Sequence, residues 1–227
     1  MNLILKLISL ILFSLIIVSC NSKTEEEVYS NSLEVNFEEQ NALSKWLTND
    51  DANWKITEEN GVRELSLLRK GEFGKVRKPS SFAAIKGLDV TDFELTLDAK
   101  VLSDSTIVGR DAIIYFAFQD PMHFYYVHLS NDNHKYHNII GIVDGKDRLP
   151  ITEKFNDDSK KRFFDYNWHK VKVVRNLAKG SIKVYVDDMK NPIQNIIDKT
   201  LTHGSVGVGS FDDFGKFRNI KLKYNRK

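Results

Sequence analysis

Two stretches near the C-terminus decide the fold: Tyr166–Arg175 reads YNWHKVKVVR, and Gly180–Met189 reads GSIKVYVDDM. In each of them, apolar and polar side chains alternate with a period of two residues. This is the pattern of a β-strand with one buried face. Gly180 opens the second stretch after the four residues NLAK, and a glycine at such a point is typical of a hairpin turn. The two stretches therefore predict neighbouring antiparallel strands.

The same alternation recurs along most of the chain before and after these stretches. It is clear in Phe93–Val101, in Asp111–Gln119 and in the glycine-rich stretch Gly204–Ile220, GSVGVGSFDDFGKFRNI. Helical periodicity is scarce, and Gly, Asn and Asp separate the alternating runs. Many short strands with such turns predict an all-β, two-sheet antiparallel sandwich. The side chains that we expect in its core include Phe116, Phe118, Trp168, Val173 and Val184.

Several phrases in this order resemble a known family. Trp168 and His169 open one strand, and the glycine-rich strand turns through Asp212 and Asp213. The stretch DPMHFYYVHLS, Asp120–Ser130, adds to the pattern, as does DDMKNPI, Asp187–Ile193. Together they resemble concanavalin-A-like and laminin-G-like jelly rolls, and in particular proteins related to the 3-keto-disaccharide hydrolase domain, often labelled family-16-like glycoside hydrolases. The resemblance covers most of the chain after residue 32, and it implies a jelly roll and a carbohydrate ligand.

The N-terminus has the features of an export signal. Lys6 precedes an apolar run, Leu7–Val18, which is too short for an ordinary membrane-spanning helix. The run ends in Ile17-Val18-Ser19-Cys20, which resembles the lipobox of bacterial lipoproteins. We therefore expect residues 1–19 to be a signal peptide and Cys20 to be the lipidated mature N-terminus. A plain secretory signal with an incidental cysteine is the alternative.

The next segment, residues 20–32, is polar and acidic and is expected to be a solvated tether. Its Ser-Lys-Thr-Glu-Glu-Glu run resembles the export signal of Bacteroidetes-type surface lipoproteins. This resemblance implies an outer-membrane location, lipid-anchored and exposed at the cell surface. The alternative is that the acidic run only keeps the tether solvated.

The remaining chain, residues 33–227, is long enough for one jelly-roll domain. The net charge is only +2, and basic and acidic residues are mixed along the chain, which argues against a nucleic-acid partner. Because Cys20 is the only cysteine, no disulfide can form within the chain. We expect a monomer that contacts the membrane only through its lipid.

The candidate site is predicted from the side chains of two strands that point away from the core. Asp111, Tyr115 and Gln119 share the non-core face of one strand, and Tyr126 and His128 share that face on the next. Tyrosine rings stack on the apolar faces of sugars, while Asp, Gln and His orient sugar hydroxyls. The pattern predicts a carbohydrate site on the concave face of a sheet. Ordinary solvent-facing strand residues would give the same pattern.

Other residues near this face offer further binding groups or metal ligands. Arg110 would pair with an anionic sugar, and the turn residues His123 and His137 would contact the ligand. A zinc site at His134 and His137 lacks a third ligand, so no metal-ligand set is predicted. Asp212 and Asp213 offer oxygens for a structural calcium ion, although Asx side chains also stabilise turns without metal. Where relatives carry Phe-Asp-Asn, this chain has Phe217-Arg218-Asn219, which weakens the case for calcium.

Three functions remain open at this stage. The first is a surface lipoprotein that binds oligo- or polysaccharide. The second is a glycoside hydrolase or lyase, acting on substrates such as 3-keto-disaccharides, with His128 and Asp111 as catalytic residues. The triplet Glu94, Thr96 and Asp98 does not match the acid pattern of family-16 enzymes, so a standard retaining mechanism is not expected. The third is a structural envelope module.

Overall fold

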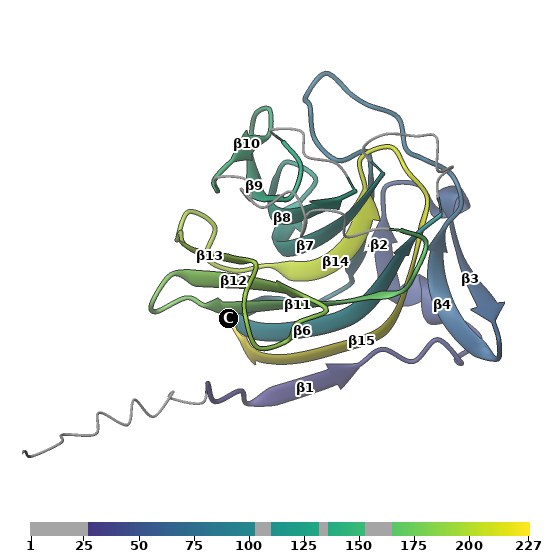
Figure 1. Cartoon of the computed structure of the whole chain (residues 1–227), viewed down its shortest axis with the longest axis horizontal. Coiled ribbons are helices and arrows are strands. Elements are labelled where there is room, and N and C mark those ends of the chain that lie inside the picture. Colours follow the sequence, from purple (N-terminus) through teal and green to yellow (C-terminus); the bar gives the residue numbers. More distant parts are fainter. Residues whose placement is uncertain (1–26, 103–109, 132–135, 153–164) are drawn as a thin grey trace, which may run out of the picture.

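The computed structural model describes residues 27–102, 110–131, 136–152 and 165–227. Their strands form two antiparallel sheets that pack face to face (Figure 1), which confirms the all-β, two-sheet sandwich. No helix among these residues is long and apolar enough to cross a membrane. His134 and Cys20 lie outside the described residues.

Sheet A contains the hairpin predicted from the sequence. Its strands in spatial order are β13 (Gln194–Ile197), β12 (Ser181–Val186), β11 (His169–Asn176), β6 (Val90–Val101), β15 (Gly215–Arg226), β4 (Val62–Leu67) and β3 (Trp54–Glu59), and β1 (Asn31–Glu34) also pairs with β15. Val173 of β11 pairs with Val184 of β12, and both side chains are fully buried. At the turn between these strands, Gly180 adopts a φ of 71°, a conformation that favours glycine.

Sheet B packs against sheet A and carries the candidate site. Its strands in spatial order are β10 (Leu149–Pro150), β9 (Ile139–Asp144), β8 (His123–Ser130), β7 (Asp111–Asp120), β14 (Ser205–Ser210), β5 (Ser81–Ile85) and β2 (Trp46–Thr48). Two short 3₁₀ helices, η1 (Ala42–Lys45) and η2 (Asp51–Asn53), flank β2 in the sequence.

The core lies between the two sheets. Phe116 of β7 is completely buried there, with its ring centroid 5.1 Å from that of Tyr125 and 5.9 Å from that of Phe93. Tyr125 stacks on Phe116 from the neighbouring strand β8, while Phe93 reaches it from β6 of sheet A. Large aromatic side chains such as these bury more apolar surface than other side chains, so each contributes strongly to the stability of the sandwich. Phe116, Val173 and Val184 therefore belong to the core, as predicted.

Two of the predicted core residues are placed differently. Trp168 is only half-buried, and its ring lies 3.9 Å from the Arg218 guanidinium carbon. Phe118 is buried on the opposite face of sheet B, with Tyr115. The cause is Ala117, which has a φ of 45° at the register break between Phe116 and Asp120. A break of this kind reverses the alternation of side chains beyond it.

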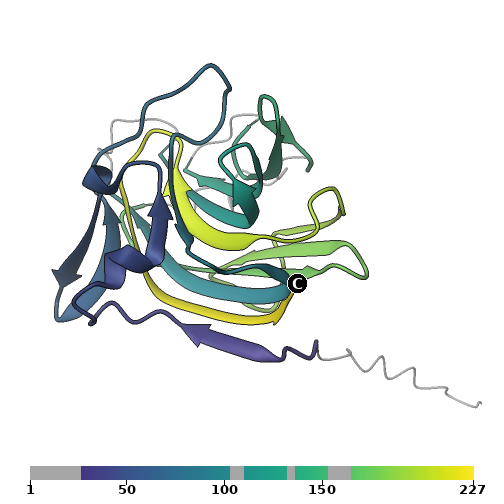
Figure 2. The ribbon, with the colours of Figure 1, turned by 180° about the vertical axis from the view of Figure 1, so that it is seen from behind.

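The face of sheet B that points away from sheet A is covered. The long segment between β4 and β5 rises above this face, as does the hairpin of β9 and β10; both are seen from the front in Figure 1 and from behind in Figure 2. Arg148 N donates to Arg77 O over 2.9 Å, which joins the two coverings. Beneath them lies a second apolar cluster, separate from the core between the sheets.

Candidate functional site

The covered face of sheet B brings four predicted site residues together. Tyr115 of β7 lies directly opposite Tyr126 of β8, and Asp111 and His128 lie nearer one end of the same strands. These four side chains thus share one face of sheet B, as their alternation along the two strands predicts. They are not exposed, however: Tyr115, Tyr126 and His128 are 0% exposed, and Asp111 is 2% exposed. They are buried because the segment between β4 and β5 and the hairpin of β9 and β10 fold over this face. Alternation along a strand cannot reveal such a covering.

Gln119, the fifth predicted residue, does not join the other four. It follows the register break at Ala117, and its side chain is exposed. Its amide donates a hydrogen bond to His203 O over 3.1 Å. Gln119 therefore helps to join β7 to the loop before β14 and lies away from the site.

Asp111 is the centre of a buried hydrogen-bond network. Its Oδ2 lies 3.1 Å from Nε2 of His128. Its Oδ1 accepts hydrogen bonds from Ser210 Oγ over 2.6 Å and from Phe211 N over 3.0 Å. The Nδ1 atom of His128 is buried and has no hydrogen-bonding partner among the described residues. A histidine held at one nitrogen with the other nitrogen unused is a candidate for proton transfer.

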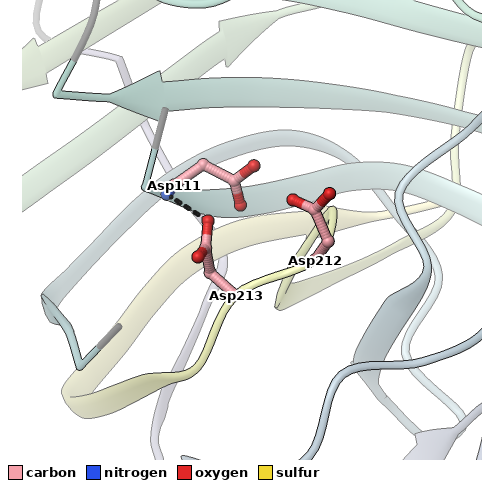
Figure 3. A group of neighbouring side chains, drawn as sticks. All are labelled: Asp111, Asp212 and Asp213. Carbon is pink, nitrogen blue, oxygen red and sulfur yellow. Dashed lines mark hydrogen bonds between the residues drawn. The ribbon is translucent and has the colours of Figure 1, made fainter. Parts of the chain in front are cut away.

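The turn after β14 supplies two further carboxylates, shown in Figure 3. Asp213 is buried, and its Oδ2 accepts a hydrogen bond from Asp111 N over 2.9 Å. Asp213 N donates to Ser210 Oγ over 2.9 Å. Asp212 is exposed, and its carboxylate points toward that of Asp111. One oxygen of each aspartate lies within 4.8 Å of the others.

These three aspartates could offer oxygens to a cation, but two of them are already engaged in a hydrogen-bonded turn. Calcium takes six to eight oxygen ligands. Both oxygens of Asp111 are already engaged by hydrogen bonds, and one oxygen of Asp213 is engaged by Asp111 N. Only Asp212 has no hydrogen bond from the described residues. The arrangement is that of a hydrogen-bonded turn, which is the alternative role that the sequence analysis gave to Asp212 and Asp213.

Tyr126 lies flat across the neighbouring strand β9. A Cβ atom added at Gly141 would come within 2.4 Å of Tyr126 Cζ, so only glycine leaves room for this ring. Burial raises the pKa of Tyr126, and the nearby Arg148 guanidinium opposes that shift. The hydroxyl makes no hydrogen bond of ordinary geometry among the described residues. Tyr126 thus holds a buried hydroxyl beside a cation.

Phe211 lies at the middle of the site. Its ring stacks on that of His128 with centroids 4.8 Å apart, and the Arg148 guanidinium carbon lies 4.3 Å from its centroid. Tyr126 meets Phe211 edge-on at 5.8 Å. The half-buried ring of His137 lies 4.5 Å from that of His128. His137, predicted as a ligand contact, therefore joins the site from its partly exposed side.

Two arginines of the site were not predicted. Arg77 lies in the segment between β4 and β5, with its guanidinium carbon 3.9 Å from the Phe73 ring centroid. Arg148 follows the turn after β9 and lies 4.7 Å from the Tyr136 ring centroid. The available signal was the basic run Leu68–Lys78, LRKGEFGKVRK, between two strands. A loop of this composition marks a surface that attracts anions.

Arg110 and His123, both predicted to bind the ligand, contact other partners than the arginines of the site. Arg110 is 7% exposed, and its guanidinium carbon lies 4.5 Å from the Tyr166 ring centroid. Its Nε and Nη1 atoms have no partner among the described residues. His123 lies at the opposite end of β8, where Nδ1 is 2.9 Å from Oδ2 of Asp120.

A depression lies outside sheet A, away from Asp111. Its volume is about 760 Å³, and its lining includes Tyr29, Glu94, Lys183 and Lys223. Lys223 Nζ lies 3.7 Å from Glu94 Oε1, so charges within the groove offset one another. Nothing in its lining resembles the buried network on sheet B.

Two solved structures share the fold. The carbohydrate-binding module CBM66 from Bacillus subtilis is 16% identical, with a TM-score of 0.55 over 79% of this chain and 95% of that one. The GH43 protein BlXynB from Bacillus licheniformis is 11% identical, with a TM-score of 0.54 over 88% of this chain and 40% of that one. Both similarities support the jelly-roll sandwich. No match is found among the curated proteins.

The family is shown by the sequence match. The family model of the 3-keto-alpha-glucoside-1,2-lyase-like domain matches residues 32–223, which span both sheets and every residue of the site. This match confirms the resemblance found in the sequence. The protein therefore belongs to the 3-keto-alpha-glucoside-1,2-lyase-like domain family.

Proposed function

We propose that the domain binds carbohydrate at the loop-covered face of sheet B, with Arg77, Arg148 and Tyr136 as contacts. The observation that carries this proposal is the stacking of two guanidinium groups on aromatic rings above a buried polar network. The guanidinium carbon of Arg77 lies 3.9 Å from the Phe73 centroid, and that of Arg148 lies 4.7 Å from the Tyr136 centroid. Family membership and the jelly-roll fold support a carbohydrate ligand.

The chemistry of these side chains suits a sugar. Aromatic rings offer faces to the C–H groups of a pyranose, and arginine offers several N–H donors in a fixed plane to its oxygens. Phe73 is 42% exposed, so a large apolar ring is already presented to solvent at this face. An exposed aromatic ring beside oriented donors is a suitable platform for a ring-shaped polar ligand.

The binding proposal is tested with Tyr136→Ala in a glycan screen followed by calorimetry. Tyr166→Ala is the matched control, because Tyr166 also lies against an arginine, 4.5 Å from the guanidinium carbon of Arg110, but not against Arg77 or Arg148. We expect Tyr136→Ala to weaken affinity about tenfold and Tyr166→Ala to leave it within about twofold. Equal effects of the two variants would contradict the placement of the site.

A second function, elimination on a keto-sugar glycoside, is favoured by the unused Nδ1 of His128. In such a reaction a base takes the proton on the carbon beside the ketone. The electron pair moves into the carbonyl as an enolate, the bond to the glycosidic oxygen then breaks as the carbonyl re-forms, and the departing oxygen takes up the proton held by the base. His128, oriented by Asp111, or the more accessible His137 would be the base. Arg148 would stabilise the enolate oxygen, with Tyr126 beside it.

Turnover measurements separate this function from binding alone. His128→Gln is compared with His123→Gln, since both histidines lie on β8 and both pair with an aspartate. With a 3-keto-glucoside as substrate, an elimination catalyst should lose about 100-fold or more in kcat with His128→Gln and little with His123→Gln. If the wild-type protein forms no product but binds the sugar, the domain is a binding module.

We also propose that Cys20 anchors the domain to the outer membrane, with the domain exposed at the cell surface. The support is the sequence alone: the apolar run that ends in Ile17-Val18-Ser19-Cys20, followed by the acidic segment. The domain itself would then act as a monomer held near the membrane by its tether.

A further inference from the structure

The covering of the site is unusually basic for a chain whose net charge is only +2. One acidic residue, Glu72, lies in the segment Leu68–Ser80 between β4 and β5. Within the described residues, no carboxylate forms an ion pair with the basic side chains of this segment. These basic residues are Arg69, Lys70, Lys75, Arg77 and Lys78.

Backbone hydrogen bonds hold two arginines side by side. Arg77 N donates to Oδ1 of Asp147 over 2.9 Å, and Arg148 N donates to Arg77 O over 2.9 Å. Both guanidinium groups then reach the ring of Phe211, with guanidinium carbons 5.4 Å and 4.3 Å from its centroid. The fold therefore brings two positive charges to the same aromatic ring.

This arrangement is unfavourable for the protein by itself. Two like charges repel, and a partly buried charge loses solvation. Burial lowers the pKa of Arg148 and the neighbouring charge of Arg77 lowers it as well, while Tyr126, Tyr136 and Asp111 oppose the shift. Burial also lowers the pKa of Lys78 in the same segment. An anion placed between the two guanidinium groups would remove the repulsion.

The stacking leaves both arginines ready for such an anion. Arg77 lies over Phe73, and Arg148 lies over Tyr136 and Phe211. Stacking uses the faces of the guanidinium group, and its N–H donors lie around the edge. Those donors match the two oxygens of a carboxylate or of a sulfate in a bidentate pair.

We propose that Arg77 and Arg148 together bind an anionic group of the sugar, a ring carboxylate or a sulfate ester. This inference rests on the proposed function, carbohydrate binding at the covered face, and adds its ligand class: acidic oligosaccharides. The neutral parts of the ligand would lie on Phe73 and Tyr136. Arg110, which the sequence analysis had assigned to an anionic sugar, stacks on Tyr166 instead.

The test uses paired probes. Uronate oligosaccharides are compared with their methyl esters, and sulfated oligosaccharides with their desulfated forms, so that each pair differs in charge and keeps sugar and linkage. Affinities of the full mature chain are measured by calorimetry at low and high salt. We expect an acidic probe to bind about tenfold or more tightly than its neutral partner, with the difference reduced by salt. Whether uronates or sulfated sugars respond identifies the anionic group.

Variants then connect the charge preference to the two arginines. Arg148→Gln should remove most of the preference for the acidic probe. Arg148→Lys, which keeps the charge but not the planar donor set, should restore it only in part. Lys146→Gln is the control, because Lys146 is an exposed cation in the same hairpin. It should change affinity within about twofold. Melting temperatures show whether each variant is folded.

The outcomes separate this inference from the proposed function. If neutral and acidic partners bind equally, or if Arg148→Gln acts no more strongly than Lys146→Gln, the anionic ligand is ruled out while carbohydrate binding stands. If no oligosaccharide of any charge binds the folded wild-type chain, the proposed binding function fails as well.

Discussion

Asp111 and His128 are joined side chain to side chain, with Oδ2 and Nε2 3.1 Å apart, and almost no solvent reaches either group. Asp111 also accepts from Ser210 Oγ and Phe211 N, so one carboxylate organises the end of β7, the start of the turn after β14, and β8. The site and the local fold therefore depend on the same residue.

Asp111→Ala should destabilise the domain by about 3 kcal/mol or more, because three buried groups would lose their acceptor. Asp212→Ala is the control from the same cluster. Its carboxylate is exposed, so it should cost no more than about 0.5 kcal/mol. Denaturant unfolding of both variants measures the difference. Similar costs for the two would show that the network around Asp111 is not important for stability.

Tyr126→Phe should leave the stability unchanged or slightly higher. The hydroxyl is buried without a hydrogen bond of ordinary geometry, so its removal relieves a desolvated polar group. If that hydroxyl contacts the ligand or assists proton transfer, the same variant should lose affinity or turnover. Thermal melting and calorimetry on one preparation test both. A clear fall in melting temperature would indicate that the hydroxyl has a structural partner.

Stability should depend on pH through Tyr125 and Asp198. Burial, together with a hydrogen bond to the Asp198 carboxylate, raises the pKa of Tyr125 to about 12. An unfolded chain has its tyrosine pKa near about 10. The stabilisation from this group is therefore present below about pH 10 and is lost as the pH rises toward 12.

At acid pH the contribution of Asp198 to stability changes in the opposite direction: it is lost as the pH falls. Burial opposes ionisation of Asp198, but the hydrogen bonds from Tyr125 and Thr200 lower its pKa overall. Its contribution is present above the unfolded value, about 3.9, and is lost as the pH falls below it. Tyr125→Phe should reduce the pH dependence of the melting temperature on both sides. Tyr185→Phe, the control, should leave the acid side as in the wild type.

Phe116→Ala should cost about 3–5 kcal/mol, because the ring is fully buried between the sheets. Trp168→Ala should cost clearly less, since that ring is half-buried beside Arg218 and Lys100. Unfolding by denaturant gives both values. A larger loss for Trp168 would mean that it belongs to the core after all, as the sequence pattern had suggested.

Cys20→Ala should release the protein from the membrane fraction or stop its maturation, because the proposed anchor attaches the lipid to the cysteine sulfur. Fractionation and mass spectrometry of the mature N-terminus measure this. Ser22→Ala, two residues later, is the control and should change neither. Normal membrane retention of Cys20→Ala would exclude the lipid anchor.

The sequence predicted the two sheets and the sharing of one face by Asp111, Tyr115, Tyr126 and His128, because alternation along a strand is a local property. It placed Phe118 and Gln119 incorrectly. Ala117 has no side-chain signal for a left-handed backbone, and the break there becomes visible only in three dimensions.

The burial of the site and its arginines could not be predicted in the same way. Which loop folds over which face depends on contacts between distant parts of the chain, such as the backbone hydrogen bond from Arg148 to Arg77. The basic composition of the segment Leu68–Ser80 was visible in the sequence. Its position over His128 and Tyr126 was not.

The place of β15 within sheet A sets the order in which the molecule can assemble. This strand pairs with β6, β4 and β1, yet it follows all the other described strands in the sequence. Sheet A therefore cannot be completed until Gly215–Arg226 has been synthesised, because β15 lies between β6 and β4. Folding must then bring together segments far apart along the chain, which is a slow process. The complete fold therefore forms only after the strand at the C-terminal end of the domain has been synthesised, and the domain cannot be finished strand by strand during its synthesis.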